Sequence, residues 1–279
     1  MNLYIYTRVE NERILSCAKL FCNRMAALGC RCFSNESTVN AIGKNIALFG
    51  DGHPAEYVVS VGGDGTMLAA AQIALKMNLP VFGINAGRVG FLCAFDRPNI
   101  LTMTVDDIKE LVSSPRALLE VRCGGKFLQY ALNEVAVTKH NYSRTVQFEL
   151  MFGNNNMGTI LGDGVIVATP TGSTGYSLSA GGPIVDSTLE ALIVTPICSH
   201  SSFSRGHVLG KKESVKITPS QRFENDVQVS ADGNDFVLCP AGTEISVTLS
   251  DRKLELLVSK NRNFYDILFK ELSIGGHEQ

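Results

Sequence analysis

Residues 58–66 read Val-Val-Ser-Val-Gly-Gly-Asp-Gly-Thr, and this stretch decides the fold of the first half of the chain. A β-branched run ends in two glycines, an aspartate, a third glycine and a threonine, and residues 67–76 follow with few helix breakers. The pattern predicts a strand, a tight turn and a helix. Glycines let another molecule approach the backbone, and a helix start offers unpaired N–H groups, so the turn is suited to phosphate.

Asp64 is the unusual member of this turn, because a bare carboxylate repels phosphate. It therefore needs a role, which the turn alone leaves open: binding Mg²⁺, accepting a proton or hydrogen-bonding a sugar hydroxyl. The alternative without a function is that Asp64 caps the following helix, as aspartate commonly does. The stretch is not the dinucleotide-binding fingerprint, because Leu68 stands where that motif has its last glycine.

The composition is that of an ordinary globular protein, with 279 residues, 45% hydrophobic and 19% charged. This length predicts one large or two modest domains. The formal charge of −2 argues against a surface built for nucleic acid. No apolar run is long enough to span a membrane, and the first residues lack the basic start and long apolar stretch of a signal peptide. We therefore expect a cytoplasmic protein.

Eight cysteines are scattered along the chain without a Cys-x-x-Cys pair, and the five histidines supply no zinc-binding spacing. We expect free, mostly buried thiols and no metal site built from protein side chains alone.

The first 97 residues alternate between strands and helices, which implies a parallel sheet with helices outside it. Ligands of such sheets collect beyond the carboxyl ends of the strands. Residues 62–66 and the loop at residues 85–91 both lie at such ends. The expected strands are residues 2–6, 31–33, 57–61 and 81–84, and the expected helices are residues 11–28 and 67–76.

After residue 97 the character changes to many short strands with polar turns, which predicts an antiparallel β domain resembling a sandwich. Gly124-Gly125 is a two-residue hairpin signal. A helix is expected at about residues 105–112, and a last helix at residues 264–272 is expected to return to the first domain. The expected domains are residues 1–97 with 261–279, and residues 98–260. The expected strands are residues 118–123, 126–132, 147–152, 157–161, 164–168, 191–195, 214–218, 227–230, 244–249 and 254–258.

A second motif, residues 169–183, reads Thr-Pro-Thr-Gly-Ser-Thr-Gly-Tyr-Ser-Leu-Ser-Ala-Gly-Gly-Pro. Its hydroxyl groups and flexible backbone suit phosphates and ribose, and Tyr176 offers a ring beside a base. A helix is expected to start within it and to stop at Gly181-Gly182. The alternative is an ordinary surface loop rich in Ser and Gly.

The two motifs in this order closely resemble those of the NAD kinase family. Asn133-Glu134, Asp163-Gly164 and the glycine-spaced residues 83–92 stand between them as in that family. The resemblance extends from about residue 57 to residue 258. The first motif alone is shared with diacylglycerol, sphingosine and phosphofructokinase-type enzymes, whereas the second is more specific. The resemblance implies an N-terminal Rossmann-like parallel α/β domain, a C-terminal antiparallel β-sandwich-like domain and a last helix that returns to the first.

The resemblance also implies a reaction, in which the γ-phosphoryl group of ATP is transferred to the 2′-hydroxyl of the adenosine ribose of NAD, giving NADP. Asp64 would accept or orient the proton of that hydroxyl, with Mg²⁺ or another divalent metal as cofactor. Phosphates would be approached by Gly62, Gly63, Gly65 and Thr66. The implied NAD contacts are Asp64, Gly65, Asn133, Glu134, Arg144, Asp163, Thr174, Gly175, Tyr176, Ser177, Leu178, Ser179 and Asn234.

Plain structural alternatives stand beside several of these roles. Asn133 and Glu134 are neighbours, so they can serve one ligand only at a strand end or bulge, and they are otherwise a polar pair on an edge strand. Asp163-Gly164 is otherwise a hairpin turn, and Arg144 a solvated surface charge.

The sequence departs from the family pattern at three positions. Gly175 replaces an alanine and leaves slightly more room. Leu161 replaces an arginine found in many bacterial members, which removes a cation near the nicotinamide half. Ser204 stands at a position that is often small and apolar.

Two other functions remain to be weighed. A lipid or sphingoid kinase would share the first motif but needs an apolar cleft or membrane-facing surface, and no stretch shows one. A sensor that has lost turnover is not supported, because Asp64 is present. Polyphosphate in place of ATP, acceptance of NADH and feedback by NADP are left open. Family members are usually homodimers or homotetramers, so we expect a homo-oligomer.

Overall fold

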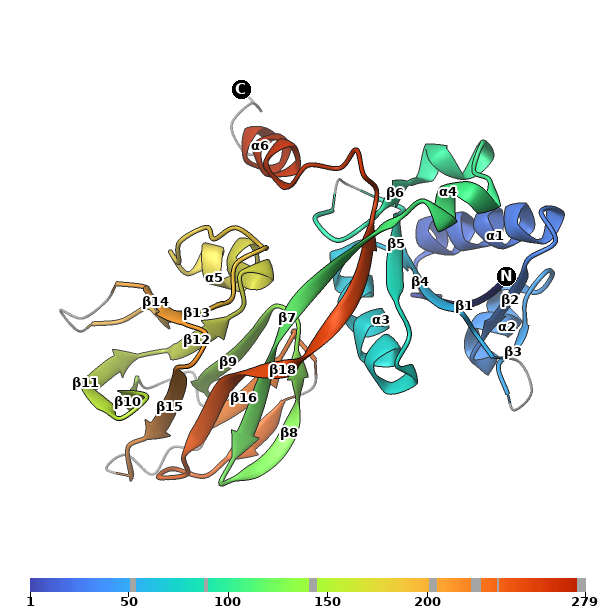
Figure 1. The fold of residues 1–279 in the computed structure, drawn as a ribbon. Helices are drawn as coiled ribbons and strands as arrows, with labels where there is room; N and C mark the ends of the chain where they lie inside the picture. The colour runs from blue at the N-terminus through green and yellow to red at the C-terminus, as the bar shows by residue number, and fades with distance from the viewer. Residues whose placement is uncertain are drawn as a thin grey trace. The chain divides into compact units, whose positions relative to one another are not determined.

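The computed structural model describes residues 1–50, 54–87, 90–140, 145–200, 205–221, 227–234 and 236–274. They form two compact units, which we call unit 1 (Met1–Pro115 with Leu254–Gln279) and unit 2 (Arg116–Lys253) (Figure 1). The domains expected from the sequence assign fewer residues to the α/β part than unit 1 contains. Within the described ranges, no helix combines the length and apolar character needed to cross a membrane.

Unit 1 is built on a parallel sheet with the strand order β3-β2-β1-β4-β5, as the alternating pattern predicts. Leu256 near the end of β18 (Ile245–Val258) adds a parallel pairing with Val81 of β5. Helices α1 (Glu12–Ala27) and α3 (Asp64–Met77) lie on opposite faces of the sheet (Figure 1). The strands are β1 (Asn2–Thr7), β2 (Arg31–Ser34), β3 (Ala47–Leu48), β4 (Tyr57–Gly62), β5 (Val81–Asn85) and β6 (Phe95–Asp96).

The remaining helical elements of unit 1 are short, apart from the last one. They are α2 (Glu36–Ile42), the 3₁₀ helix η1 (Arg97–Leu101), α4 (Val105–Lys109) and α6 (Phe264–Ile274). The segment after β18 returns to unit 1, as expected, and the ring of Phe264 lies 5.9 Å from that of Phe91. The expected helix at residues 105–112 ends earlier, because the chain enters β7 (Val112–Cys123).

Helix α3 positions the first motif. It begins at Asp64, earlier than residue 67 where the sequence predicts it, so the aspartate lies inside the first turn. Met67, Ala70, Ala71, Ala74 and Leu75 are buried, and their spacing of three and four residues is that of one helix face. The helix ends at Asn78, which has the left-handed backbone conformation common after a last turn (φ 54°).

Unit 2 contains two antiparallel sheets. One sheet joins β11-β10-β15-β18 with β7 and β8, and the other has the order β14-β13-β12-β9-β16-β17. One cluster of buried side chains includes Phe148 from the first sheet and Val165 and Val229 from the second. The sandwich-like β domain expected from the sequence is therefore confirmed.

Its strands follow the expected pattern closely. Residues 244–249 and 254–258 belong to one continuous strand, β18, and the short strands β14 and β17, rich in exposed residues, were not expected. Gly124 and Gly125 both have positive φ, as the hairpin signal requires. The strands besides β7 are β8 (Lys126–Ala131), β9 (Glu134–Lys139), β10 (Val146–Phe152), β11 (Asn155–Gly162), β12 (Gly164–Ala168), β13 (Ala191–Ile197), β14 (His207–Gly210), β15 (Ser214–Pro219), β16 (Val227–Ala231) and β17 (Val237–Cys239).

The expectation of free thiols is wrong for two of the eight cysteines. Cys123 at the end of β7 and Cys239 at the end of β17 form a disulfide, since the fold of unit 2 brings these strand ends together. The other six are free, and all of them except the exposed Cys198 are buried.

Asn78 gives a test of how α3 is terminated. Asn78→Ala should lower the free energy of unfolding by about 1 kcal/mol, because an alanine Cβ is strained in the left-handed region. Asn78→Gly should leave it unchanged or slightly higher, since glycine adopts this conformation without strain. Urea unfolding followed by circular dichroism measures both variants. Equal effects of Ala and Gly would contradict this account of the helix end.

Candidate functional site

The glycine turn of unit 1 lies at the carboxyl end of β4, where parallel sheets bind ligands. A cavity of about 480 Å³ opens beside it. Gly62 must be a glycine, because a Cβ there would collide with the side chain of Thr66. Gly63 precedes the helix without a side chain in the way, so the first N–H groups of α3 are accessible to an anion. The cavity is lined by Arg8, Glu10, Asn11, Ile14, Gly63, Gly65 and Thr66.

Arg8 is a residue of this cavity that the sequence reasoning missed. Its guanidinium Nη2 donates a hydrogen bond of 3.3 Å to the carbonyl oxygen of Gly65. It follows β1, which pairs with β4, so both strand ends meet at the same edge of the sheet. The position of Arg8 directly after the first expected strand was the signal available in the sequence. A cation here can neutralise phosphate bound at the turn.

The carboxylate of Asp64 is held by a second loop of unit 1. Oδ2 accepts the N–H of Phe91 at 2.9 Å, and Oδ1 accepts the N–H of Leu92 at 3.1 Å. A Cβ on Gly90 would lie 2.6 Å from Oδ1, so this loop approaches as closely as glycine permits. The helix has Gly63 as its N-cap and no side-chain cap bond, so the capping alternative for Asp64 is wrong.

The surroundings of Asp64 shift the pKa of its carboxyl in opposite directions. Burial raises the pKa of its carboxyl, whereas the N–H groups of Phe91 and Leu92 and the charge of Arg262 lower it. Burial is the largest of these causes. A carboxylate with a raised pKa, whose direction is fixed by two donors, is suited to accept a proton from a hydroxyl group.

In unit 2 the structure brings Asn133 and Glu134 together with the second motif. Glu134 is the first residue of β9 and Asn133 lies just before it, which is the strand-end arrangement that lets neighbours serve one ligand. A Cβ on Gly175 would lie 3.1 Å from Glu134 Oε2 and 3.5 Å from Asn133 Nδ2. Both side chains therefore face the turn that contains Gly175, and the edge-strand alternative is not what the structure shows.

Hydrogen bonds attach the second motif to the backbone of Leu132 and Asn133. Thr169 N–H donates to Asn133 O at 2.8 Å, and Thr169 Oγ1 donates to Leu132 O at 2.6 Å. Gly172 has no room for a side chain, because its Cβ would collide with the backbone of Asn133. The motif forms η2 (Thr171–Thr174) and α5 (Tyr176–Ser179), which confirms that a helix starts within it.

Two oxygen atoms in this region are buried without a partner. Among the described residues, Asn133 Oδ1 and Glu134 Oε2 have no hydrogen-bond donor. Burial, followed by the nearby charge of Asp232, raises the pKa of Glu134 to about 7, although the N–H of Tyr176 lowers it. Buried acceptors without donors are costly and rare in folded proteins. A ligand with hydroxyl or amine groups would supply the missing donors.

Asp232 is a second residue that sequence reasoning missed as a member of the site. Its buried carboxylate accepts the N–H groups of Leu132 at 2.7 Å, Asn133 at 2.7 Å and Glu134 at 3.3 Å. It lies in the turn after β16 with φ 54°, beside Gly233 with φ 67°. The signal for Asp232 in the sequence was an Asp-Gly pair between two apolar stretches. Such a pair is typical of a hairpin turn and does not by itself indicate a binding site.

The other predicted residues of the second motif differ in exposure. Tyr176 and Ser179 are exposed, and Thr174 and Leu178 are half-buried. Ser177 is buried and shares a hydrogen bond of 2.9 Å with Thr195 Oγ1, so its hydroxyl serves the fold. Asn234 is exposed in the turn between β16 and β17.

Asp163 lies between β11 and β12, which belong to different sheets, so the hairpin alternative for Asp163-Gly164 is wrong. Its Oδ1 forms an ion pair of 2.6 Å with Lys139 Nζ. Lys139 thus supplies a cation beside Asp163, two residues along the chain from Leu161, the position at which many family members carry arginine. Arg144 and Ser204 lie outside the described residues.

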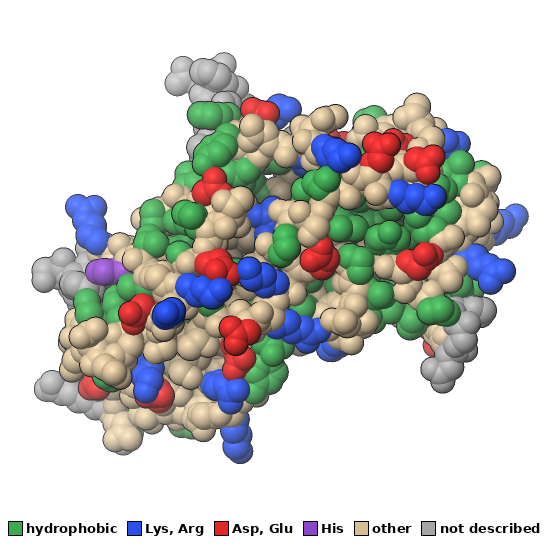
Figure 2. All heavy atoms as spheres, viewed as in Figure 1, with side chains coloured by type: hydrophobic (Ala, Val, Ile, Leu, Met, Phe, Trp, Pro, Cys, Tyr) green, Lys and Arg blue, Asp and Glu red, His purple; other side chains and the backbone are tan. Residues whose placement is uncertain are grey.

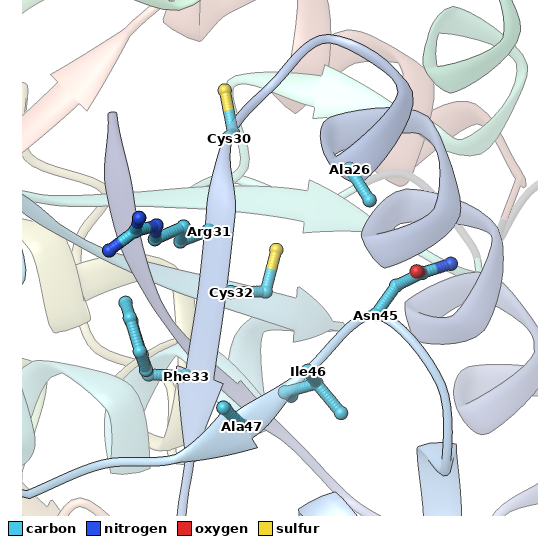
Figure 3. Close-up of a pocket in the computed structure, with 8 residues that line it drawn as sticks. All are labelled: Ala26, Cys30, Arg31, Cys32, Phe33, Asn45, Ile46 and Ala47. Atoms are coloured by element: carbon cyan, nitrogen blue, oxygen red, sulfur yellow. The ribbon is translucent and has the colours of Figure 1, made fainter.

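A second cavity of unit 1, of about 430 Å³, lies between α1 and the strands β2 and β3 (Figure 3). Cys32 points to the side of β2 that faces α1, whereas Arg31 and Phe33 point to the other side (Figure 3). Burial raises the pKa of the Cys30 thiol, which makes it a weak nucleophile. No predicted site residue lines this cavity, so it is not the candidate site.

An α/β unit with a glycine turn suited to phosphate and a β unit with unpaired acceptors beside a hydroxyl-rich turn are features expected of a nucleotide-binding protein. Residues 27–110 match the family model of the ATP-NAD kinase N-terminal domain, and residues 132–259 match that of the ATP-NAD kinase C-terminal domain. The NAD kinase of Thermoanaerobacter sp. (strain X514) is 35% identical over 225 residues, which cover 78% of this chain and 79% of that protein. The NAD kinase of Pseudomonas fluorescens (strain SBW25) is 37% identical over 231 residues, covering 80% and 77%.

Solved structures agree with these matches. An NAD kinase from Archaeoglobus fulgidus in complex with ATP has a TM-score of 0.73 and 26% identity, covering 98% of this chain and 99% of that one. A yeast NADH kinase complexed with NADH has a TM-score of 0.82 at 22% identity, covering 100% and 89%, which shows likeness of fold. The chain belongs to the NAD kinase family.

The raised pKa of Glu134 predicts a pH-dependent stability. The unfolded chain has the ordinary pKa of 4.5 and the folded chain one of about 7, so the folded state retains the proton longer. The free energy of unfolding should therefore fall as the pH rises from about 4.5 through 7, by up to about 3 kcal/mol. Glu134→Gln should remove this part of the pH dependence in urea unfolding measured between pH 5 and pH 8.

Glu149→Gln is the matched control, because Glu149 is exposed on β10 and its replacement should leave the pH dependence as it is. If Glu134→Gln follows the same pH curve as the unaltered protein, the carboxyl of Glu134 is not buried in the way described.

Proposed function

We propose that this protein transfers the γ-phosphoryl group of ATP to the 2′-hydroxyl of the adenosine ribose of NAD, forming NADP. The observation that carries the proposal is the pair of buried, unpartnered oxygens on Asn133 and Glu134 beneath the hydroxyl-rich turn. Ribose hydroxyls and the amine of adenine are donors of the kind that these oxygens lack. Family membership supports the reaction, and the Archaeoglobus fulgidus relative in complex with ATP supports ATP as donor.

The residues of unit 1 would act on the phosphates and on the attacking hydroxyl. Backbone N–H groups at Gly63 and Gly65 and the guanidinium of Arg8 would neutralise the phosphoryl oxygens, and Thr66 would line the same turn. Asp64, directed by two N–H donors, would accept the proton of the 2′-hydroxyl. A positioned general base accelerates such a step by on the order of 10²–10⁴-fold.

The residues of this chain are compatible with a Mg²⁺ ion that binds together with ATP. The described residues contain no group of three His, Cys, Asp or Glu side chains arranged to hold a metal. Mg²⁺ in kinases commonly needs only one or two carboxylates besides phosphate oxygens and water. Glu10, which lines the cavity beside the turn, is the carboxylate that would contribute. The ion would neutralise charge on the phosphates.

Unit 2 would hold NAD. Asn133 and Glu134 would bind the adenosine portion, Thr174, Tyr176 and Ser179 would surround adenine, and the backbone of residues 175–178 would line the same turn. Asp163 would contact the nicotinamide end of NAD. Asn234 and Arg144 would add further contacts to the dinucleotide. The ion pair of Asp163 with Lys139 supports a polar contact at the nicotinamide end.

The protein's setting is part of the proposal. We place it in the cytoplasm as a homodimer or homotetramer, as family resemblance suggests. Lys and Arg side chains are interspersed with Asp and Glu on the face in Figure 2, which supports a surface not made for nucleic acid or membrane.

One assay tests the reaction. Purified protein with Mg²⁺ is given ATP or polyphosphate as donor, and NAD, NADH, diacylglycerol or sphingosine as acceptor. We expect NADP from NAD and ATP, measured by an NADP-specific dehydrogenase. Phosphorylation of a lipid without phosphorylation of NAD would favour the lipid kinase and overturn the proposal.

Asp64→Asn tests the proton acceptor. The amide keeps the shape of the side chain but has lost the basic oxygen, so kcat should fall by at least about a hundredfold. NAD binding, measured by calorimetry, should survive because Asn133 and Glu134 are unaltered. An unchanged kcat would remove Asp64 from the mechanism.

A further inference from the structure

Arg262 is a half-buried cation in the segment that follows β18. Its side chain is 14% exposed and its backbone N–H closes a turn onto Ser259 O at 3.0 Å. Nη2 donates a hydrogen bond of 2.7 Å to the carbonyl oxygen of Gly90, and Nη1 lies 3.8 Å from Asp96 Oδ1. A guanidinium that binds a backbone carbonyl in a distant loop orders that loop.

The carbonyl of Gly90 and the N–H of Phe91 belong to the same peptide unit. A trans peptide is planar, and its carbonyl and N–H groups point in opposite directions. Arg262 therefore holds one end of this unit while Asp64 Oδ2 holds the other, at 2.9 Å from Phe91 N. A donor on the carbonyl polarises the peptide and strengthens its N–H as a donor. The guanidinium acts on Asp64 through one rigid group.

We propose that Arg262 is a positioning residue for Asp64, whose carboxylate it fixes in direction through the Gly90–Phe91 peptide. The inference rests on the proposed role of Asp64 as proton acceptor. It extends the active site to the segment after β18, which the sequence reasoning treated only as a helix returning to the first domain.

Neighbouring contacts fix the position of Arg262 relative to the loop that contains Gly90 and Phe91. Asn85 Nδ2 donates to Asp96 Oδ1 at 3.1 Å, so the carboxylate beside Arg262 is itself fixed to the end of β5. The ring of Phe264, two residues after Arg262, meets that of Phe91. Polar and aromatic contacts thus join the same two segments, which argues against an incidental contact of a long side chain.

The ionisable groups around Asp64 make Arg262 the source of the electrostatic effect. The charge of Arg262 lowers the pKa of Asp64, which burial raises. Burial also raises the pKa of the Cys93 thiol, which therefore stays neutral through the physiological range. Asp96 is next to Arg262, and Arg8 contacts the carbonyl of Gly65. Removing the charge of Arg262 should therefore favour protonated, inactive Asp64 at low pH.

The test compares Arg262→Met, Arg262→Lys and Asp64→Asn in the full chain, with Lys260→Met as control. Lys260 is an exposed cation of the same turn, so its replacement removes a charge without touching the loop. kcat and KM for NAD are measured with ATP and Mg²⁺ from pH 5 to pH 9, and thermal unfolding is recorded for each variant.

Arg262→Met should lower kcat about 10- to 100-fold, with KM for NAD within about threefold, because a misdirected catalytic group costs rate more than binding. The acidic limb of its kcat profile should move up by at least about half a pH unit. Arg262→Lys should keep the acidic limb near its original position, since the charge is retained, and should recover part of kcat. Lys260→Met should resemble the unaltered protein.

The inference is overturned if Arg262→Met matches Lys260→Met, or if its kcat falls while the acidic limb stays in place and only thermal stability changes. If Asp64→Asn is inactive in the same experiment, that failure concerns Arg262 alone and the proposed function stands. Full activity of Asp64→Asn would overturn the role of Asp64 and this inference with it.

Discussion

Backbone N–H groups that converge on a carboxylate, half-buried in unit 1 and buried in unit 2, organise both halves of this protein. In unit 1 the N–H groups of Phe91 and Leu92 bind Asp64, and in unit 2 those of Leu132, Asn133 and Glu134 bind Asp232. An ionised carboxylate in a protein interior is unfavourable unless donors surround it. These hydrogen bonds therefore fix each loop to the element that carries the carboxylate. The geometry of each candidate site depends on them.

The two carboxylates serve different ends. Asp64 takes part in the proposed chemistry, so its donors direct it while leaving lone pairs for a substrate hydroxyl. Asp232 is occupied by three backbone donors, and its charge raises the pKa of Glu134 beside it. Glu134 in turn is left with an unpartnered oxygen. Unit 2 thus contains an unfavourable arrangement that a bound nucleotide would relieve, which is common at functional sites.

Glycine is the other constraint that both sites share. Gly62 and Gly90 allow Thr66 and Asp64 to pack against backbone, and Gly172 and Gly175 do the same for Asn133 and Glu134. At Gly175 the family pattern has alanine, and a methyl group there would come within 3.1 Å of Glu134 Oε2. This departure leaves the carboxyl of Glu134 more room than an alanine would, within the same turn.

Sequence by itself determined the parallel α/β part, the sandwich-like β part, the glycine turn with Asp64 and the hydroxyl-rich turn, because periodicity and turn chemistry are local properties. It also gave the condition that Asn133 and Glu134 can serve one ligand only at a strand end or bulge, and the structure places the pair at the start of β9. Only the tertiary structure decided that Asp64 binds a loop instead of capping its helix and that Cys123 meets Cys239. It alone also decided that Arg8, Asp232 and Arg262 contact residues or loops of the candidate sites. These partners are far apart along the chain, and nothing in a local pattern encodes which distant backbone groups a buried charge will bind.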